Sequence, residues 1–115
     1  MVVFTELADA DVDRIFRALA DATRRDILQR TLTGEQTVSA LAAAYDMSFA
    51  AVQKHVAVLE AAHLVVKRAE GRERLVRADP DTIARARRLL AEYERVWRSR
   101  IDRLDALLAE YDTPA

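Results

Sequence analysis

Residues 37–77 read TVSALAAAYDMSFAAVQKHVAVLEAAHLVVKRAEGRERLVR, and this stretch decides the fold. Its first part, residues 37–45, is rich in alanine and leucine and predicts a short helix. Ser48 is a favourable N-cap residue, and three apolar residues follow it at helical spacing, so a second helix is predicted from Ser48 to about Ala62. The order of a short helix, a tight turn and a second capped helix predicts a helix-turn-helix over residues 37–62.

A β-hairpin is predicted directly after the second helix, over residues 64–77. Two strand-like runs, residues 64–66 and 75–76, flank Glu70-Gly71-Arg72. Gly71 supplies the positive φ that a tight hairpin turn often requires. A hairpin at this place is a wing, so the predicted fold is mainly α with a small β-hairpin, a winged helix-turn-helix.

The second helix of such a motif lies in the major groove of duplex DNA, where each base pair presents a distinct edge. Small residues beside a glutamine and a lysine allow close approach, because Gln53 can pair with adenine and Lys54 can reach guanine or a phosphate. The alternative is an ordinary solvated helix face. The residues predicted to contact DNA from this helix are Ser48, Phe49, Ala50, Gln53, Lys54 and His55.

Arginines at the predicted wing would lie against a neighbouring groove or the backbone, and we expect Arg68, Arg72 and Arg74 to contact phosphates. The alternative is a charged exposed strand edge that discourages aggregation. The net charge of the chain is only −1, but residues 46–77 hold six Lys/Arg against four Asp/Glu, a net +2. The positive excess therefore falls on the predicted docking region.

Two basic features have a structural alternative. His55 lies on the flank of its helix, where a packed or hydrogen-bonded histidine is as reasonable as a phosphate contact. Arg24 and Arg25 lie in the first turn of a helix that begins after the cap residue Asp21, where the helix dipole disfavours cations. Pairing with Asp21, Asp26 or acids of the last helix is the preferred interpretation.

A dimer is predicted from the last helix. Asp79-Pro80-Asp81 opens a helix that runs to about Tyr111, some 45 Å at ~1.5 Å per residue. A compact domain of this size is only ~35 Å across, so the helix overhangs it. We expect the helices over residues 11–20 and 80–111 to form a homodimer interface through Ile15, Phe16, Leu90, Tyr93, Trp97, Ile101, Leu104 and Leu108. A helix folded onto its own core is the alternative.

The composition bounds the remaining possibilities. A chain of 115 residues forms one domain, 1–115, and it has no cysteine, no apolar run long enough for a membrane span and no N-terminal signal segment. A cytoplasmic protein is therefore expected. There is no Gly-rich phosphate loop and no cysteine nucleophile, so we predict that it is not an enzyme and has no cofactor.

Several segments in this order resemble the ArsR/SmtB family of winged-helix repressors: LADATRRDIL (19–28), VSALA (38–42), MSFAAVQKHVAVLE (47–60) and Gly71-Arg72. The resemblance implies a homodimer, with first and last helices at the interface, that represses transcription from an imperfect palindrome. Carried over by position, Ser48, Gln53, Lys54 and His55 fall on the recognition helix, and the three wing arginines fall on the wing.

The chain departs from the family pattern at several positions. Ala22 stands where proline is common, Gln53 where serine is frequent, and His63 where glycine is usual before the wing. Family members that sense metals use cysteines, or histidine and carboxylate clusters on the last helix. This chain has no cysteine and no histidine on its last helix, so no metal site is predicted.

The predicted function is a sequence-specific regulator of transcription that binds double-stranded DNA, a homodimeric repressor of a palindromic operator. A winged helix used only for protein contact is the alternative from another class. Phe16, Tyr93 and Trp97 could line a pocket for an unknown small-molecule effector, although aromatic residues at helical spacing are usually core.

Overall fold

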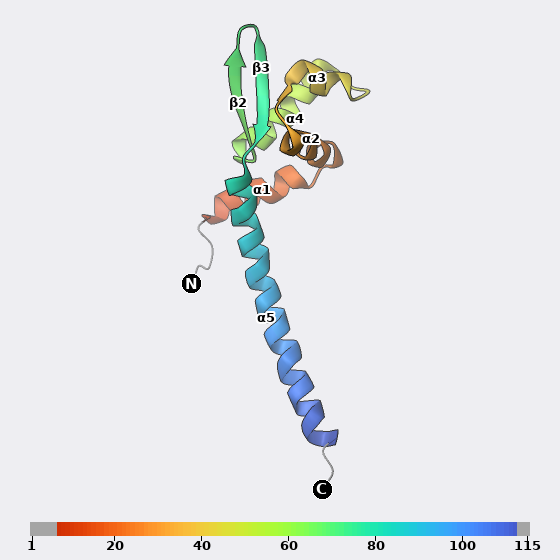
Figure 1. The fold of residues 1–115 in the computed structure, drawn as a ribbon, viewed down its shortest axis with the longest axis vertical. Coiled ribbons are helices and arrows are strands. Elements are labelled where there is room, and N and C mark those ends of the chain that lie inside the picture. The colour runs from red at the N-terminus through yellow and green to blue at the C-terminus, as the bar shows by residue number, and fades with distance from the viewer. Residues whose placement is uncertain (1–6, 113–115) are drawn as a thin grey trace.

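The computed structural model describes residues 7–112, so the predicted domain limits at 1 and 115 lie outside the described residues. The chain is mainly helical with a small three-stranded antiparallel sheet, which confirms the predicted fold class (Figure 1). The elements, in chain order, are α1 (Asp9–Leu19), α2 (Ala22–Thr33), β1 (Gln36–Thr37), α3 (Val38–Ala43), α4 (Phe49–Ala61), β2 (Val65–Glu70), β3 (Glu73–Ala78) and α5 (Pro80–Asp112).

Side-chain caps fix where the helices begin. Asp21 accepts a hydrogen bond from the backbone N–H of Arg24 at 3.0 Å, and Ser48 accepts one from that of Ala51 at 3.1 Å, which confirms both predicted caps. Thr37 caps α3 in the same way. Each such cap is worth about 1 kcal/mol. The turn and helix starts around α4 are therefore fixed locally by the sequence.

The C-terminal end of α4 closes with a left-handed residue that is not glycine. His63 has φ of 60°, and its N–H donates to the carbonyl of Glu60 at 2.9 Å. The next N–H, that of Leu64, donates to the carbonyl of Leu59 at 3.0 Å. These two bonds form a Schellman motif. The helix thus closes as it would with glycine, although histidine must adopt a backbone conformation that its Cβ disfavours.

The sheet joins the wing to the helix-turn-helix. Its strand order is β1-β3-β2, and Val65 to Glu70 pair in sequence with Ala78 to Glu73 across a two-residue turn at Gly71-Arg72. Gly71 has φ of 61°, as predicted for the turn. The sequence did not predict β1: Thr37 was expected to begin a helix, whereas it pairs with Leu75 and also caps α3. The short strand ties the middle of β3 to the start of α3.

The core collects apolar side chains from every helix and from the sheet. The predicted inner side of α4 is confirmed, because Val52, Val56 and Leu59 are buried. One expectation for the first helix is wrong. Ile15 was predicted at the dimer interface but is 1% exposed, because it faces inward from α1 and packs into the core of its own domain.

Helix α5 extends far beyond the rest of the molecule (Figure 1). The molecule measures 77 × 31 × 20 Å, and its radius of gyration is 20.3 Å, against about 13 Å for a compact domain of this length. On α5, only the N-terminal residues Thr82, Ala86 and Leu89 are buried. The predicted overhang is therefore present, and the distal part of α5 has no intramolecular cover among the described residues.

Candidate nucleic-acid interface

The structure brings the predicted residues of α4 to one exposed side of the helix. Ser48, Phe49, Ala50, Gln53 and Lys54 are all exposed, while the opposite side of α4 is packed into the core. On this exposed side, between the first residue of α4 and Gln53, Phe49 has the only bulky side chain. A helix with this surface can approach base edges closely and offers an amide and an ammonium group to reach them.

The first turn of α4 combines a polar and an apolar group. The hydroxyl oxygen of Ser48 accepts the N–H of Ala51, so its O–H remains available as a donor. Beside it, Phe49 leaves 48% of its surface exposed, a large value for an aromatic residue. Donors that point outward at a helix N-terminus suit a phosphate, and an exposed aromatic side chain suits the methyl group of thymine.

His55 differs from the other predicted contacts, because it is only partly exposed and has a partner inside the protein. Its Nδ1 lies 3.3 Å from Nη1 of Arg24, on α2. The structural alternative considered for His55 is therefore the one that the geometry supports. Arg24 also approaches the carboxylate of Asp21 at 4.0 Å, as expected from the sequence.

The two arginines at the start of α2 have partners that the sequence did not indicate. Arg24 donates from Nε to the carbonyl of Ala18 at 2.8 Å and from Nη2 to that of Arg17 at 3.0 Å. Arg25 donates to the carbonyl of Leu19 at 2.8 Å. These carbonyls end α1, where the helix dipole is negative and favours cations. The arginines that are unfavourable in their own helix are thus stabilised by the end of the preceding one.

The wing arginines fall into two groups. Arg68 donates two hydrogen bonds to Glu35, at 2.9 and 3.0 Å, and forms an ion pair with Glu70 at 3.1 Å. The guanidinium of Arg68 lowers the pKa of the Glu35 carboxyl below its ordinary value, chiefly through these hydrogen bonds. Arg72 and Arg74 are exposed near the tip. The positive field of the wing therefore comes more from the tip than from Arg68.

The sequence also did not reveal a polar contact between the turn that follows α3 and helix α2. The hydroxyl of Tyr45 donates to the carboxylate of Asp26, and Arg30 donates to the same carboxylate at 2.8 Å. Partial burial, together with the hydrogen bond to Asp26, raises the pKa of Tyr45 to about 12. The contact joins the end of α3 to α2 and thus supports the turn before α4. Residues 19 positions apart carry no local pattern that would reveal it.

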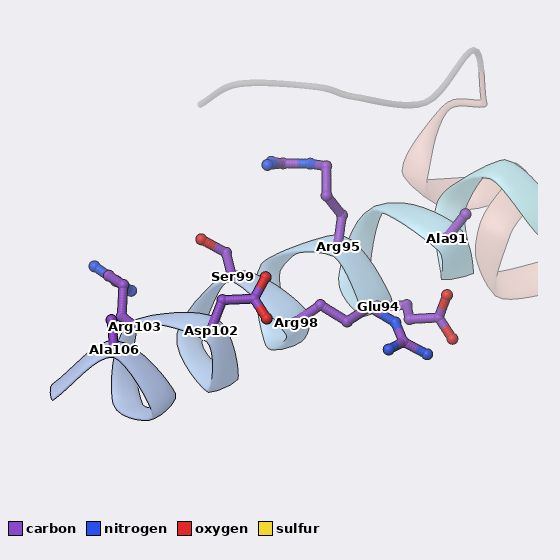
Figure 2. Close-up of a pocket in the computed structure, with 8 residues that line it drawn as sticks. All are labelled: Ala91, Glu94, Arg95, Arg98, Ser99, Asp102, Arg103 and Ala106. Atoms are coloured by element: carbon purple, nitrogen blue, oxygen red, sulfur yellow. The ribbon is translucent and has the colours of Figure 1, made fainter. Parts of the chain in front are cut away.

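Other candidate sites are weaker. Eight residues line a shallow hollow on the polar side of α5, and Figure 2 shows their side chains pointing outward from successive turns of that one helix. Among the described residues, only α5 lines this hollow, so it is a helix surface. Within residues 7–112, no three His, Cys, Asp or Glu side chains are grouped as a metal site requires. In the same range, no helix has the length and apolar character needed to cross a membrane.

Known proteins are similar to this chain in sequence and in fold. A family model described as a helix-turn-helix domain matches residues 19–68. The HTH-type transcriptional regulator Rv2034 of Mycobacterium tuberculosis is 39% identical over 85 residues, which cover 74% of this chain and 77% of that protein. A crystal structure of an ArsR family transcriptional regulator is 33% identical, with a TM-score of 0.76, over 81% of this chain and 96% of that one.

This chain belongs to the ArsR family. It is a transcriptional regulator with a helix-turn-helix DNA-binding domain, and the relatives it matches are regulators, not enzymes. The solution NMR structure of Mb0332 from Mycobacterium bovis, named as a possible ArsR-family transcriptional regulator, is that of a homodimeric winged helix-turn-helix DNA-binding domain. It is 27% identical and covers 85% of this chain and 94% of its own, with a TM-score of 0.60.

Proposed function

We propose that this ArsR-family protein is a homodimeric repressor that binds a palindromic operator in the cytoplasm. The observation that carries the proposal is the exposed apolar stripe on α5, which a single copy leaves uncovered. A stripe of this length needs a second surface, and the same helix of another copy is the simplest one. The stripe consists of the exposed Leu90, Tyr93, Trp97, Leu104 and Leu108 together with the half-buried Ile101.

The homodimeric relative from M. bovis supports this assignment. On α1, Phe16 is 38% exposed and is available to the interface, whereas the buried Ile15 is not. In such a dimer the two α4 helices would enter successive major grooves about 34 Å apart, which explains why the operator would be a palindrome.

Within each half-site we assign base reading to Gln53 and Lys54 and phosphate contact to Ser48, Arg72 and Arg74. Arg68 has a smaller role, because two glutamates already neutralise it. Phe49 and Ala50 form the apolar part of the surface that faces the groove.

The test is binding to an operator selected from random duplexes. We expect Gln53→Ala and Lys54→Ala each to cost roughly 1–3 kcal/mol at the selected site. Arg98→Ala, on the polar side of α5, removes a charge elsewhere and should leave the affinity unchanged (Figure 2). If about six phosphates are neutralised, log K should fall with log salt at a slope near −5.

Two outcomes would contradict the proposal. If the protein retains no duplex DNA even at low salt, the winged helix serves protein contact instead. If it binds DNA but a reporter gene behind the selected operator is activated in its presence, the protein is not a repressor.

A further inference from the structure

One side chain connects α1 to the DNA-facing helix. The guanidinium of Arg24 donates to the carbonyls of Ala18 and Arg17 at the end of α1, at 2.8 and 3.0 Å. Its remaining terminal nitrogen, Nη1, lies 3.3 Å from Nδ1 of His55 on α4. The Arg24 side chain is only 16% exposed. A planar guanidinium can hold several acceptors in fixed directions at once, which a lysine cannot.

The direction of the contact with His55 follows from chemistry. Arginine stays protonated and has no acceptor, so Arg24 must be the donor and Nδ1 of His55 the acceptor. His55 is then the neutral tautomer that carries its proton on Nε2. A protonated ring would have no lone pair at Nδ1, and the contact would be lost.

We propose that Arg24 and His55 are positioning residues that hold α4 in its docking orientation on α1, so that this protein binds DNA in the form with neutral His55. The inference rests on the proposed function, in which α1 belongs to the dimer interface and α4 enters the groove. Two recognition helices can reach successive grooves only if each is held firmly relative to that interface. When the hydrogen bond between Arg24 and His55 is lost, a smaller fraction of dimers has the docking geometry. The apparent affinity for DNA then falls by the same fraction.

The charges around the contact do not replace the lost acceptor. Asp21 faces Arg24 from the cap of α2, and its pKa is lowered chiefly by the backbone N–H of Arg24, so it stays ionised near neutral pH. It attracts both cations but cannot restore a lone pair on the ring. On α4 itself, Lys54 is exposed.

Within residues 7–112, the other elements packed on α4 bring no side-chain acceptor to Arg24, and the backbone carbonyls of Ala18 and Arg17 on α1 are already bonded to its Nε and Nη2. Helix α3 has no charged residue, Lys67 on β2 is paired with Glu60, and the side chain of Arg17 on α1 is exposed. Loss of the Nδ1 lone pair therefore decides the outcome of protonation.

A phosphate contact by His55 would behave in the opposite way. A protonated histidine in the groove adds a positive charge, so acidification would strengthen binding and steepen the salt dependence. A positioning histidine loses its bond to Arg24 on protonation, so acidification weakens binding. The sign of the pH effect thus separates the two roles.

The experiment measures affinity for the selected operator between roughly pH 8 and pH 6, the range in which histidine titrates. We expect the affinity of the unmodified protein to fall by about threefold to tenfold on acidification, the scale of the net contribution of one hydrogen bond. His55→Asn places an amide oxygen near the position of Nδ1 and does not titrate, so this variant should keep its affinity and lose the pH dependence.

Two further variants control the result. His63→Asn removes the other histidine of the chain, and asparagine tolerates its positive φ, so this variant should keep the pH dependence. Arg24→Lys keeps the charge, but its single nitrogen cannot reach the three separate acceptors that the planar guanidinium spans, so it should bind more weakly at both pH values. If Arg24→Lys does not fold, the His55→Asn comparison still decides.

The inference is overturned if acidification strengthens binding of the unmodified protein, or if His55→Asn lowers the salt slope by about one, as a lost phosphate contact would. It is also overturned if the protein and His55→Asn show the same pH dependence while both bind DNA. Absence of duplex binding at any pH would instead overturn the proposed function, and this inference with it.

Discussion

The winged-helix body and the distal half of α5 use apolar residues in opposite ways. In the body, Ile27 and Leu59 are completely buried, within a core to which every helix and the sheet contribute. On distal α5, Leu104 leaves 52% of its surface exposed and Trp97 even more. The body therefore stabilises itself, whereas the distal helix presents apolar surface that no other part of residues 7–112 buries.

The opposite side of distal α5 makes this comparison sharper. There, charged residues are interspersed with the small residues Ala91, Ser99 and Ala106 (Figure 2). Arg95 on this side pairs with Glu92 of the same helix at 2.6 Å. The polar groups on that side are satisfied by neighbours in the same helix and by solvent. One helix thus has a side that is complete in the single copy and a side that is not.

Charging the apolar stripe should have the largest effect. We expect Leu104→Glu combined with Leu108→Glu to raise the dimer dissociation constant by roughly a thousandfold or more, because burial of each leucine contributes about 1.5–3 kcal/mol in each copy. Sedimentation equilibrium would measure it. Ser99→Glu combined with Ala106→Glu adds the same charge on the opposite side and should leave the dimer intact. Equal effects from both pairs would remove the distinction between the two sides.

Truncating one residue in each region should separate two kinds of stability. Ile27→Ala should lower the free energy of unfolding by about 2–5 kcal/mol at every protein concentration, because it leaves a cavity in the body. Leu104→Ala should lower it only at concentrations at which the dimer forms. Urea unfolding at low and high micromolar concentration would test this. A concentration-independent loss for Leu104→Ala would show that α5 packs within its own chain.

The wing allows the same comparison for charged side chains, between those already paired within the protein and those left exposed. Arg72→Ala combined with Arg74→Ala should reduce the salt slope of DNA binding by nearly two, at ~0.9 for each phosphate contact. Arg68→Ala should reduce it by less than one, because Arg68 is already paired with Glu35 and Glu70. Titration of operator binding with potassium chloride would measure both. A full unit lost with Arg68 would mean that its ion pairs open on DNA.

Removing the Cβ at the end of α4 should stabilise the body slightly. His63→Gly should raise the free energy of unfolding by up to about 1 kcal/mol, because His63 has φ of 60°, where a side chain is unfavourable. Thermal unfolding would detect the increase. His63→Ala keeps the Cβ and should bring no gain. A loss on His63→Gly would indicate that the imidazole has a stabilising role that outweighs its backbone strain.

The smallest effect concerns acid stability. Hydrogen bonds from Tyr45 and, to a lesser degree, Arg30 lower the pKa of Asp26, so this carboxylate stabilises the fold above its unfolded value near 3.8. That contribution is lost as the pH falls through the lower, folded pKa. Tyr45→Phe removes the larger cause and should flatten the acid side of the stability profile while leaving its shape above pH 6 unchanged. Urea unfolding across pH 3–7 would show it.

Local patterns predicted the parts of this fold that local forces determine. The caps at Asp21 and Ser48, the turn at Gly71 and the start of α5 all depend on residues within a few positions of each other. Strand β1 was missed because two residues carry no alternation. The buried direction of Ile15 was missed because the apolar side of α1 is wide enough to face two surfaces.

The candidate site shows the same division. The exposed side of α4 could be derived from its spacing alone. The bond between Arg24 and His55 joins residues 31 positions apart, and Glu35 neutralises Arg68 from 33 positions away. Such partners depend on how helices and strands are placed in space, and no single sequence window contains both. The structure was therefore needed to show which basic residues already have partners within the protein.

The junction between β3 and α5 has a mechanical consequence. Strand β3 ends at Ala78 and α5 begins at Pro80, and Asp79 between them accepts the N–H of Asp81 at 3.0 Å. Proline has a fixed φ, so this junction has little freedom to bend. In the proposed dimer, a change in the angle at which the two α5 helices cross would therefore rotate each body and displace the tip of each β2–β3 hairpin. A molecule that separated the C-terminal ends of the two α5 helices would in this way weaken DNA binding without contacting either α4 helix.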